Sequence, residues 1–139
     1  MSASPPAAVT PMAYARVIAE AFRRRGLSPD EALKLAQITP AQLQRPQARI
    51  TALQMEWLSG AAMQALDDEA LGAFSRRLPW GSYGMLARAS LTSPTLGLAL
   101  RRWCRHHGLL ADDLRLRLLT AGDTAAIVVD EAPAHQALM

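Results

Sequence analysis

The sequence has few of the residues on which many small proteins depend. Its 139 residues include one cysteine, Cys104, so no disulfide can form within the chain. Aromatic residues make up 5% of the chain, and Lys34 is the only lysine among 15 basic residues. A small secreted fold held together by disulfides is therefore excluded. The lone thiol fits a reducing cytoplasm, which is the compartment that we expect.

Long apolar runs are also missing. No stretch reaches the length of a transmembrane helix, and the first residues lack the basic and then apolar pattern of a signal peptide. We expect residues 1–10 to be a disordered lead and residues 132–139 to be a tail without a defined pattern. Residues 11–131 are then one folded domain, which is an ordinary length for one.

Helix-forming residues are abundant. Half of the chain is hydrophobic, and most of these residues are Ala and Leu. Start signals of Ser or Thr precede apolar stripes, with Ser28 and Glu31 spaced as a capping box and with Ser93 and Pro94 expected at the N-cap and first helical positions. Gly108 is expected to end the last helix. Thr51 and Gln54 repeat the capping-box spacing. These signals predict helices over residues 11–26, 28–37, 51–66, 69–75 and 94–107, a further helix that Ser82 caps and that carries Met85, Leu86 and Ala89 on one face, and a single turn around Leu43.

The pattern changes after the last helix. Leu114, Leu116 and Leu118 alternate with arginines, a period of two that predicts a strand. Gly122-Asp123 is a suitable two-residue loop, and the return strand would run over residues 124–130. The predicted fold is mostly helical α+β, with five to seven helices followed by a β-hairpin or small sheet.

The basic residues give a net charge of only +3 and lie in short groups, as solvated helix faces do. Residues 13–44 nevertheless have the helix-turn-helix order of some DNA-binding proteins. The reading helix would begin with Asp30 and Glu31, whose carboxylates repel phosphates. This makes DNA binding by residues 13–44 the weaker alternative.

No pattern in the chain indicates an enzyme, and we expect no catalytic residue and no cofactor. Gly-rich phosphate loops, GxSxG and HExxH are absent. Cys104 and His107 share one helix face, but zinc needs more ligands at suitable spacing, so we predict no metal site.

The aromatic residues offer two interpretations. They can fill the core, or they can line an apolar ligand cavity with a few polar groups at its wall. The second interpretation gives the candidate ligand-binding set, namely Trp57, Trp80, Tyr83, Arg88, Trp103 and His107.

Several patches together resemble the N-terminal, arabinose-binding-like effector domain of AraC/XylS-type transcription regulators. They cover residues 13 to 130 and keep a common order and spacing. They are carried by Pro46, Arg49-Ile50, Glu69-Ala70-Leu71-Gly72, Gly81, Leu86, Ser93, Thr95-Leu96-Gly97, Ala99-Leu100-Arg101, Leu109-Leu110 and Asp112-Asp113-Leu114.

The resemblance implies an effector-sensing and dimerisation domain. Such a domain binds a small-molecule effector, is expected to form a homodimer, and controls an attached helix-turn-helix DNA-binding domain that has no counterpart in this sequence. DNA would then be bound only through that domain, and no membrane partner is implied. A dimerisation or scaffold module without a ligand is the alternative from a different class of protein.

Overall fold

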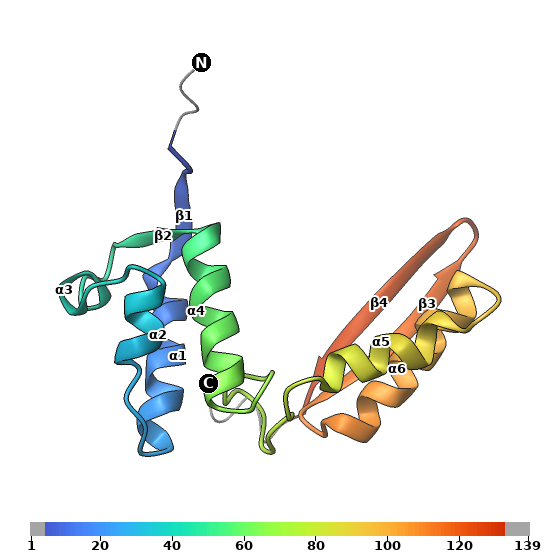
Figure 1. Ribbon diagram of the computed structural model, residues 1–139. Coiled ribbons are helices and arrows are strands. Elements are labelled where there is room, and N and C mark those ends of the chain that lie inside the picture. The colour runs from blue at the N-terminus through green and yellow to red at the C-terminus, as the bar shows by residue number, and fades with distance from the viewer. Residues whose placement is uncertain (1–4, 133–139) are drawn as a thin grey trace. The chain divides into compact units, whose positions relative to one another are not determined.

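The computed structural model describes residues 5–132, and the chain divides into two compact units, Met1–Leu71 and Gly72–Met139. Among the described residues there are six helices and two antiparallel two-stranded sheets, so the mostly helical α+β prediction is confirmed (Figure 1). The delimitation of a single sensing domain over residues 11–131 stays a prediction.

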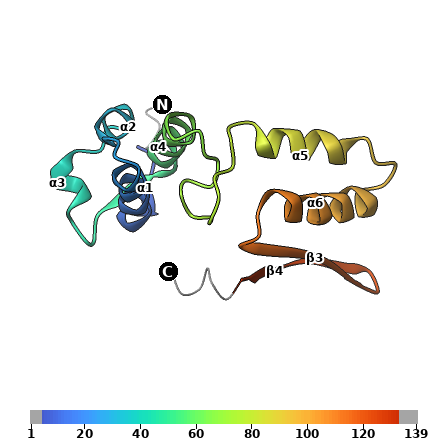
Figure 2. The ribbon, with the colours of Figure 1, turned by 90° about the horizontal axis from the view of Figure 1, so that it is seen from below.

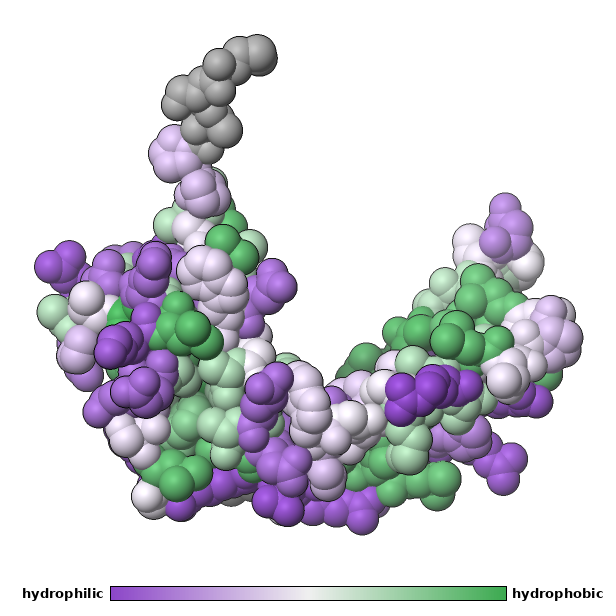
Figure 3. Space-filling model, in the orientation of Figure 1, coloured by the Kyte–Doolittle hydropathy of each residue, from purple (hydrophilic) through white to green (hydrophobic). Residues whose placement is uncertain are grey.

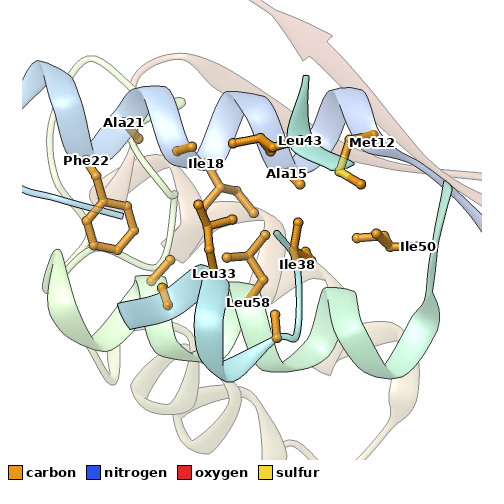
Figure 4. Close-up of a cluster of buried hydrophobic side chains, with 14 of the residues drawn as sticks. Met12, Ala15, Ile18, Ala21, Phe22, Leu33, Ile38, Leu43, Ile50 and Leu58 are labelled. Carbon is orange, nitrogen blue, oxygen red and sulfur yellow. The ribbon is translucent and has the colours of Figure 1, made fainter. Parts of the chain in front are cut away.

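Unit 1 consists of two short strands and four helices. A core of apolar side chains lies between α1, α2 and α4 (Figure 4). Ile18 and Phe22 of α1 and Leu58 of α4 are at most 3% exposed, which is the one-sided burial that a period of 3.6 predicts. The elements are β1 (Ala8–Pro11), α1 (Met12–Arg24), α2 (Asp30–Leu35), α3 (Pro40–Leu43), β2 (Arg49–Thr51) and α4 (Ala52–Ala65).

Capping boxes begin two of these helices. Thr39 and Thr51 each accept a hydrogen bond from the backbone N–H three residues later, while Gln42 and Gln54 accept from the N-cap N–H. The capping box expected at Ser28 is wrong. Pro29 is the N-cap of α2, and the Ser28 hydroxyl accepts from the N–H of Asp30 at 3.2 Å instead.

The helices α1, α2 and α4 end in the same motif. In each, the residue after the C-cap is left-handed and its N–H and that of the next residue return to carbonyls of the last turn, as in a Schellman motif. The left-handed residues are Gly26, Gln37 and Asp67, with φ of 69°, 56° and 47°. Only the first has the glycine that this conformation favours.

The strands of unit 1 are a correction to the expected disordered lead. Residues 8–10 belong to β1, which pairs antiparallel with β2, and residues 1–4 lie outside the described residues. The Arg49 guanidinium donates to the Val9 carbonyl at 2.6 Å, and the N–H of Met12 donates to the Ala48 carbonyl at 3.0 Å. Strands of three and four residues are too short for an alternating pattern to show in the sequence.

Unit 2 has three layers. Helix α5 (Ser82–Leu91) packs on α6 (Leu96–Leu110), and the opposite side of α6 packs on the hairpin of β3 (Leu114–Ala121) and β4 (Thr124–Glu131) (Figure 2). The register pairs Ala121 with Thr124 around Gly122-Asp123, and Gly122 has φ of 58°. The predicted hairpin and its loop are therefore confirmed.

Four local predictions in this region are wrong, and two of them concern the stretch before α6. Residues 69–75 form turns rather than a helix, because the backbone is left-handed at Leu71 and Gly72. Ser82 lies inside α5, whose N-cap is Gly81, and its hydroxyl donates to the Pro79 carbonyl at 2.6 Å.

The other two corrections concern α6. Its N-cap is Thr95, whose hydroxyl accepts from the N–H of Leu98, rather than Ser93. The helix also continues through Gly108 to Leu110. The Arg76 guanidinium donates to the carbonyls of Leu109 and Leu110 at 2.6 and 2.9 Å and thereby satisfies this end.

Candidate functional site

Three of the predicted ligand-binding residues gather where the start of α5 meets the last turns of α6. Trp103 and His107 are one turn apart on α6, and Tyr83 is the second residue of α5. The Tyr83 and Trp103 rings stack with centroids 6.2 Å apart and planes inclined by 17°. The Tyr83 hydroxyl lies 3.2 Å from Nε2 of His107. We call Tyr83, Trp103 and His107, with Phe74, the aromatic cluster.

Phe74 is the member of the aromatic cluster that sequence reasoning missed. Its ring meets that of His107 edge-on at 6.4 Å. It lies in the stretch for which a helix was predicted, where its direction could not be inferred. The neighbouring Ser75 fixes this loop, since its N–H and hydroxyl donate to the Asp113 carboxylate at 2.9 and 3.0 Å.

His107 is the polar centre of the cluster. Its side chain is buried, with a residue exposure of 3%, and burial lowers the pKa of the ring. The ring is therefore neutral at pH 7, with one nitrogen as donor and the other as acceptor. Nε2 is taken by Tyr83, whereas Nδ1 is buried without a hydrogen-bond partner among residues 5–132.

An unsatisfied buried nitrogen has an energetic cost. Leaving such a group without a partner costs about 1–3 kcal/mol. Native proteins keep few of these groups, and each one calls for an explanation such as a bound molecule. The arrangement can therefore supply one hydrogen bond from Nδ1 and aromatic surface from its neighbours.

The other three predicted residues, Trp57, Trp80 and Arg88, are exposed. Trp80 is 51% exposed in the turn before α5, and the exposed Arg88 side chain folds back toward Gly84 of its own helix. Trp57 lies on α4 in unit 1 and is 38% exposed. Their place in a ligand site stays a prediction.

Unit 1 contains surface hollows that sequence reasoning did not indicate. One of about 640 Å³ lies between α2 and α4 and is bordered by Phe22, Glu31 and Lys34. A second, of about 690 Å³, contains Trp57 and shares Leu35, Ala61 and Ala65 with the first. Both are open depressions between helices, and their polar groups are exposed side chains.

The structure also shows how the side chains suited to metal binding and the stretch with a helix-turn-helix order are arranged. No group of three or more His, Cys, Asp or Glu side chains within residues 5–132 is arranged to hold a metal ion. Cys104 is buried on α6, one turn before His107. In the stretch that has a helix-turn-helix order, α2 has only six residues, of which Ala32 and Leu33 are buried in the core.

Comparisons with known proteins found a matching family model and a distant relative. The family model for the arabinose-binding domain of AraC transcription regulators, N-terminal, matches residues 26–139. An ornithine utilization regulator of Pseudomonas aeruginosa is 27% identical over 114 residues, which are 81% of this chain and 34% of that protein. The chain thus spans about a third of this curated relative, and no solved structure matches it. None of the helices within residues 5–132 combines the length and the hydropathy that crossing a membrane requires. Because the family model covers well over half of the sequence, the chain belongs to the family of arabinose-binding N-terminal domains of AraC transcription regulators.

Proposed function

We propose that the chain is a ligand-sensing and dimerisation domain that binds a small-molecule effector in the cytoplasm. The family membership supports a regulatory domain rather than an enzyme. DNA would be contacted only through a separate helix-turn-helix domain of the regulator. The single observation that carries the site is the buried Nδ1 of His107, which has no partner among the described residues.

The aromatic cluster is the proposed effector site. A hydrogen-bonding group of the effector would satisfy Nδ1, and an adjacent apolar or planar part would pack on Trp103 or Phe74. The effector acts by population shift, because it stabilises the arrangement of α5 and α6 that it binds better. An effector that binds both states equally well would not shift the equilibrium between them.

The experiment is a calorimetric titration of the 139-residue chain with a panel of amino acids and their amines. The printed name of the relative makes L-ornithine the first probe. Trp103→Phe keeps an aromatic ring in place and is expected to weaken binding about tenfold, the effect of losing about 1.4 kcal/mol of contact. Tyr14→Phe is the control, because Tyr14 is 58% exposed on α1 and lies outside the candidate set, and it should leave the titration unchanged.

The alternative is a dimerisation module without a ligand. The observation that favours it is the close packing of the aromatic cluster, together with the positions of the hollows of unit 1, which other residues line. Absence of binding across the panel, with a lowered melting temperature for Trp103→Phe, would place Trp103 in the core only and favour this alternative.

A further inference from the structure

Helix α6 covers one face of the hairpin of unit 2, and it covers that face over β3 but hardly over β4. Residues opposite each other in the register point to the same side, so Leu116 shares a side with Val129, and Leu118 with Ile127. The two leucines are half-buried because α6 packs on β3. Ile127 and Val129 are 46% and 55% exposed, because α6 hardly reaches β4. Figure 3 shows hydrophobic residues on one face of unit 2.

The outer edge of β4 is also unprotected. Among residues 5–132, β4 pairs only with β3, so its other edge leaves backbone donors and acceptors without a strand. Natural proteins guard such edges with charges or proline. Arg115 and Arg117 supply those charges on β3, whereas residues 124–129 of β4 contain neither a charge nor a proline.

The loop fixes which groups point outward from β4. In a two-residue hairpin the flanking residues, Ala121 and Thr124, form a hydrogen-bonded pair, and such pairs alternate along the strands. Residues 124, 126, 128 and 130 therefore turn their backbone groups to β3. The outward set, free to pair with another strand, is Ala125, Ile127, Val129 and Glu131.

We propose that β4 pairs antiparallel with β4 of a second copy of this chain, with the two-fold axis at Val128. This register places Ile127 opposite the partner's Val129 and joins the exposed apolar positions of both copies. It also places Glu131 opposite the partner's Ala125 and Asp130 opposite the partner's Ala126. No acidic side chain then faces another, and like charges directly opposite would destabilise the pair.

Neighbouring registers fit less well. Centring the pair on Ile127 places Glu131 opposite the partner's Asp123, so two carboxylates meet. Centring it on Val129 places Glu131 and Asp130 opposite the partner's Ile127 and Val128 and loses the apolar pairing. In the four-stranded sheet centred at Val128, no two carboxylates lie opposite each other and the exposed apolar side chains of the two copies pair. The inference rests on the dimerisation part of the proposed function and gives it a surface.

The register can be tested by disulfide formation in a Cys104→Ser background. Val128 would face its own copy as a non-hydrogen-bonded pair, with Cα atoms about 4.5 Å apart. That spacing lies within the range for a disulfide. Val128→Cys should therefore give a covalent dimer under mild oxidation. Ala126→Cys is the matched control, because its copies would be four residues out of register, about 13 Å apart, and should remain unlinked.

Sedimentation velocity over a concentration series provides the second measurement. The unmodified chain should dimerise, and Ile127→Lys should raise the dissociation constant of the dimer at least about tenfold, since a lysine at this edge opposes pairing. Leu119→Lys is the control, because Leu119 is 49% exposed on β3 and on the other side of the hairpin. A melting curve of each variant confirms that it is folded.

The outcomes separate the proposals. A chain that stays monomeric at every concentration overturns the β4 interface and the dimerisation part of the proposed function together. If the chain dimerises, but Ile127→Lys leaves the dissociation constant unchanged and Val128→Cys forms no disulfide between copies, only the β4 interface is overturned. The calorimetric titration with amino acids tests effector binding independently of both.

Discussion

The guanidinium of Arg25 and the carboxylate of Asp68 lie 2.6 Å apart, although 43 residues separate them in the chain. Asp68 is 1% exposed, and Arg25 also donates to the Leu66 carbonyl at 2.9 Å. The second oxygen of Asp68 accepts from the N–H of Ala70 at 3.0 Å. These bonds join the end of α1 to the turn that follows α4.

Removing the cation of this pair should destabilise unit 1. Arg25→Ala removes the charge-assisted hydrogen bond to the buried Asp68 carboxylate, and we expect the free energy of unfolding to fall by about 1.5–3 kcal/mol. Arg23→Ala is the control, because Arg23 pairs with Glu20 at the surface and exposed pairs contribute at most about 1 kcal/mol. Urea unfolding measures both variants, and equal losses would contradict the structural role of Arg25.

The left-handed helix ends predict opposite effects of two substitutions. Gln37 has φ of 56°, so Gln37→Gly should relieve strain and leave stability unchanged or raised by about 0.5–1 kcal/mol. Gly26 has φ of 69°, and Gly26→Ala should lower stability by about 1 kcal/mol. Thermal unfolding followed by circular dichroism distinguishes the two. A clear loss for Gln37→Gly would show that its side chain, rather than its backbone, matters there.

The start of α6 gives a third prediction. Thr95→Ala removes the hydroxyl that accepts from Leu98 and should cost about 1 kcal/mol. Ser93→Ala should cost nothing, because the buried Ser93 hydroxyl has no partner within residues 5–132. The melting temperatures of the two single variants provide the comparison. A lower melting temperature for Ser93→Ala than for Thr95→Ala would indicate that Ser93 is the N-cap.

The buried histidine predicts a dependence of stability on pH. Burial lowers the pKa of His107 in the folded state, whereas the unfolded chain binds the proton near the ordinary value of about 6.5. Stability is thus full above about pH 6.5 and decreases as the pH falls from there toward the lowered pKa. His107→Gln should flatten this decrease. Tyr83→Phe should retain it, because burial rather than the tyrosine bond causes the shift.

Local patterns predicted the elements that local interactions determine. The alternation after Leu114 and the Gly122-Asp123 loop were enough for the hairpin, and the spacing of Thr51 and Gln54 was enough for the start of α4. The start of α6 was wrong because Ser93 and Thr95 are both competent caps. In the structure the Thr95 hydroxyl accepts from the N–H of Leu98, whereas the Ser93 hydroxyl has no partner within residues 5–132.

The contacts within the aromatic cluster could be predicted from the sequence only in part. The spacing of Trp103 and His107 placed both on one helix face, and Tyr83 was found through its residue type. Phe74 was missed because its position depends on a loop that Asp113 holds through Ser75, 38 residues earlier. The orphan nitrogen of His107 follows from burial in three dimensions and has no sequence signal.

The central position of α6 has a mechanical consequence. The helix is held between α5 on one side and β3 on the other, and side chains packed at interior density leave it little room to slide within one interface alone. A small rotation of α6 about its axis, for instance one that brings Nδ1 of His107 toward a bound group, would have to be accommodated by both neighbours. A movement of α6 that begins at its interface with α5 is therefore expected to displace β3 as well, and the reverse.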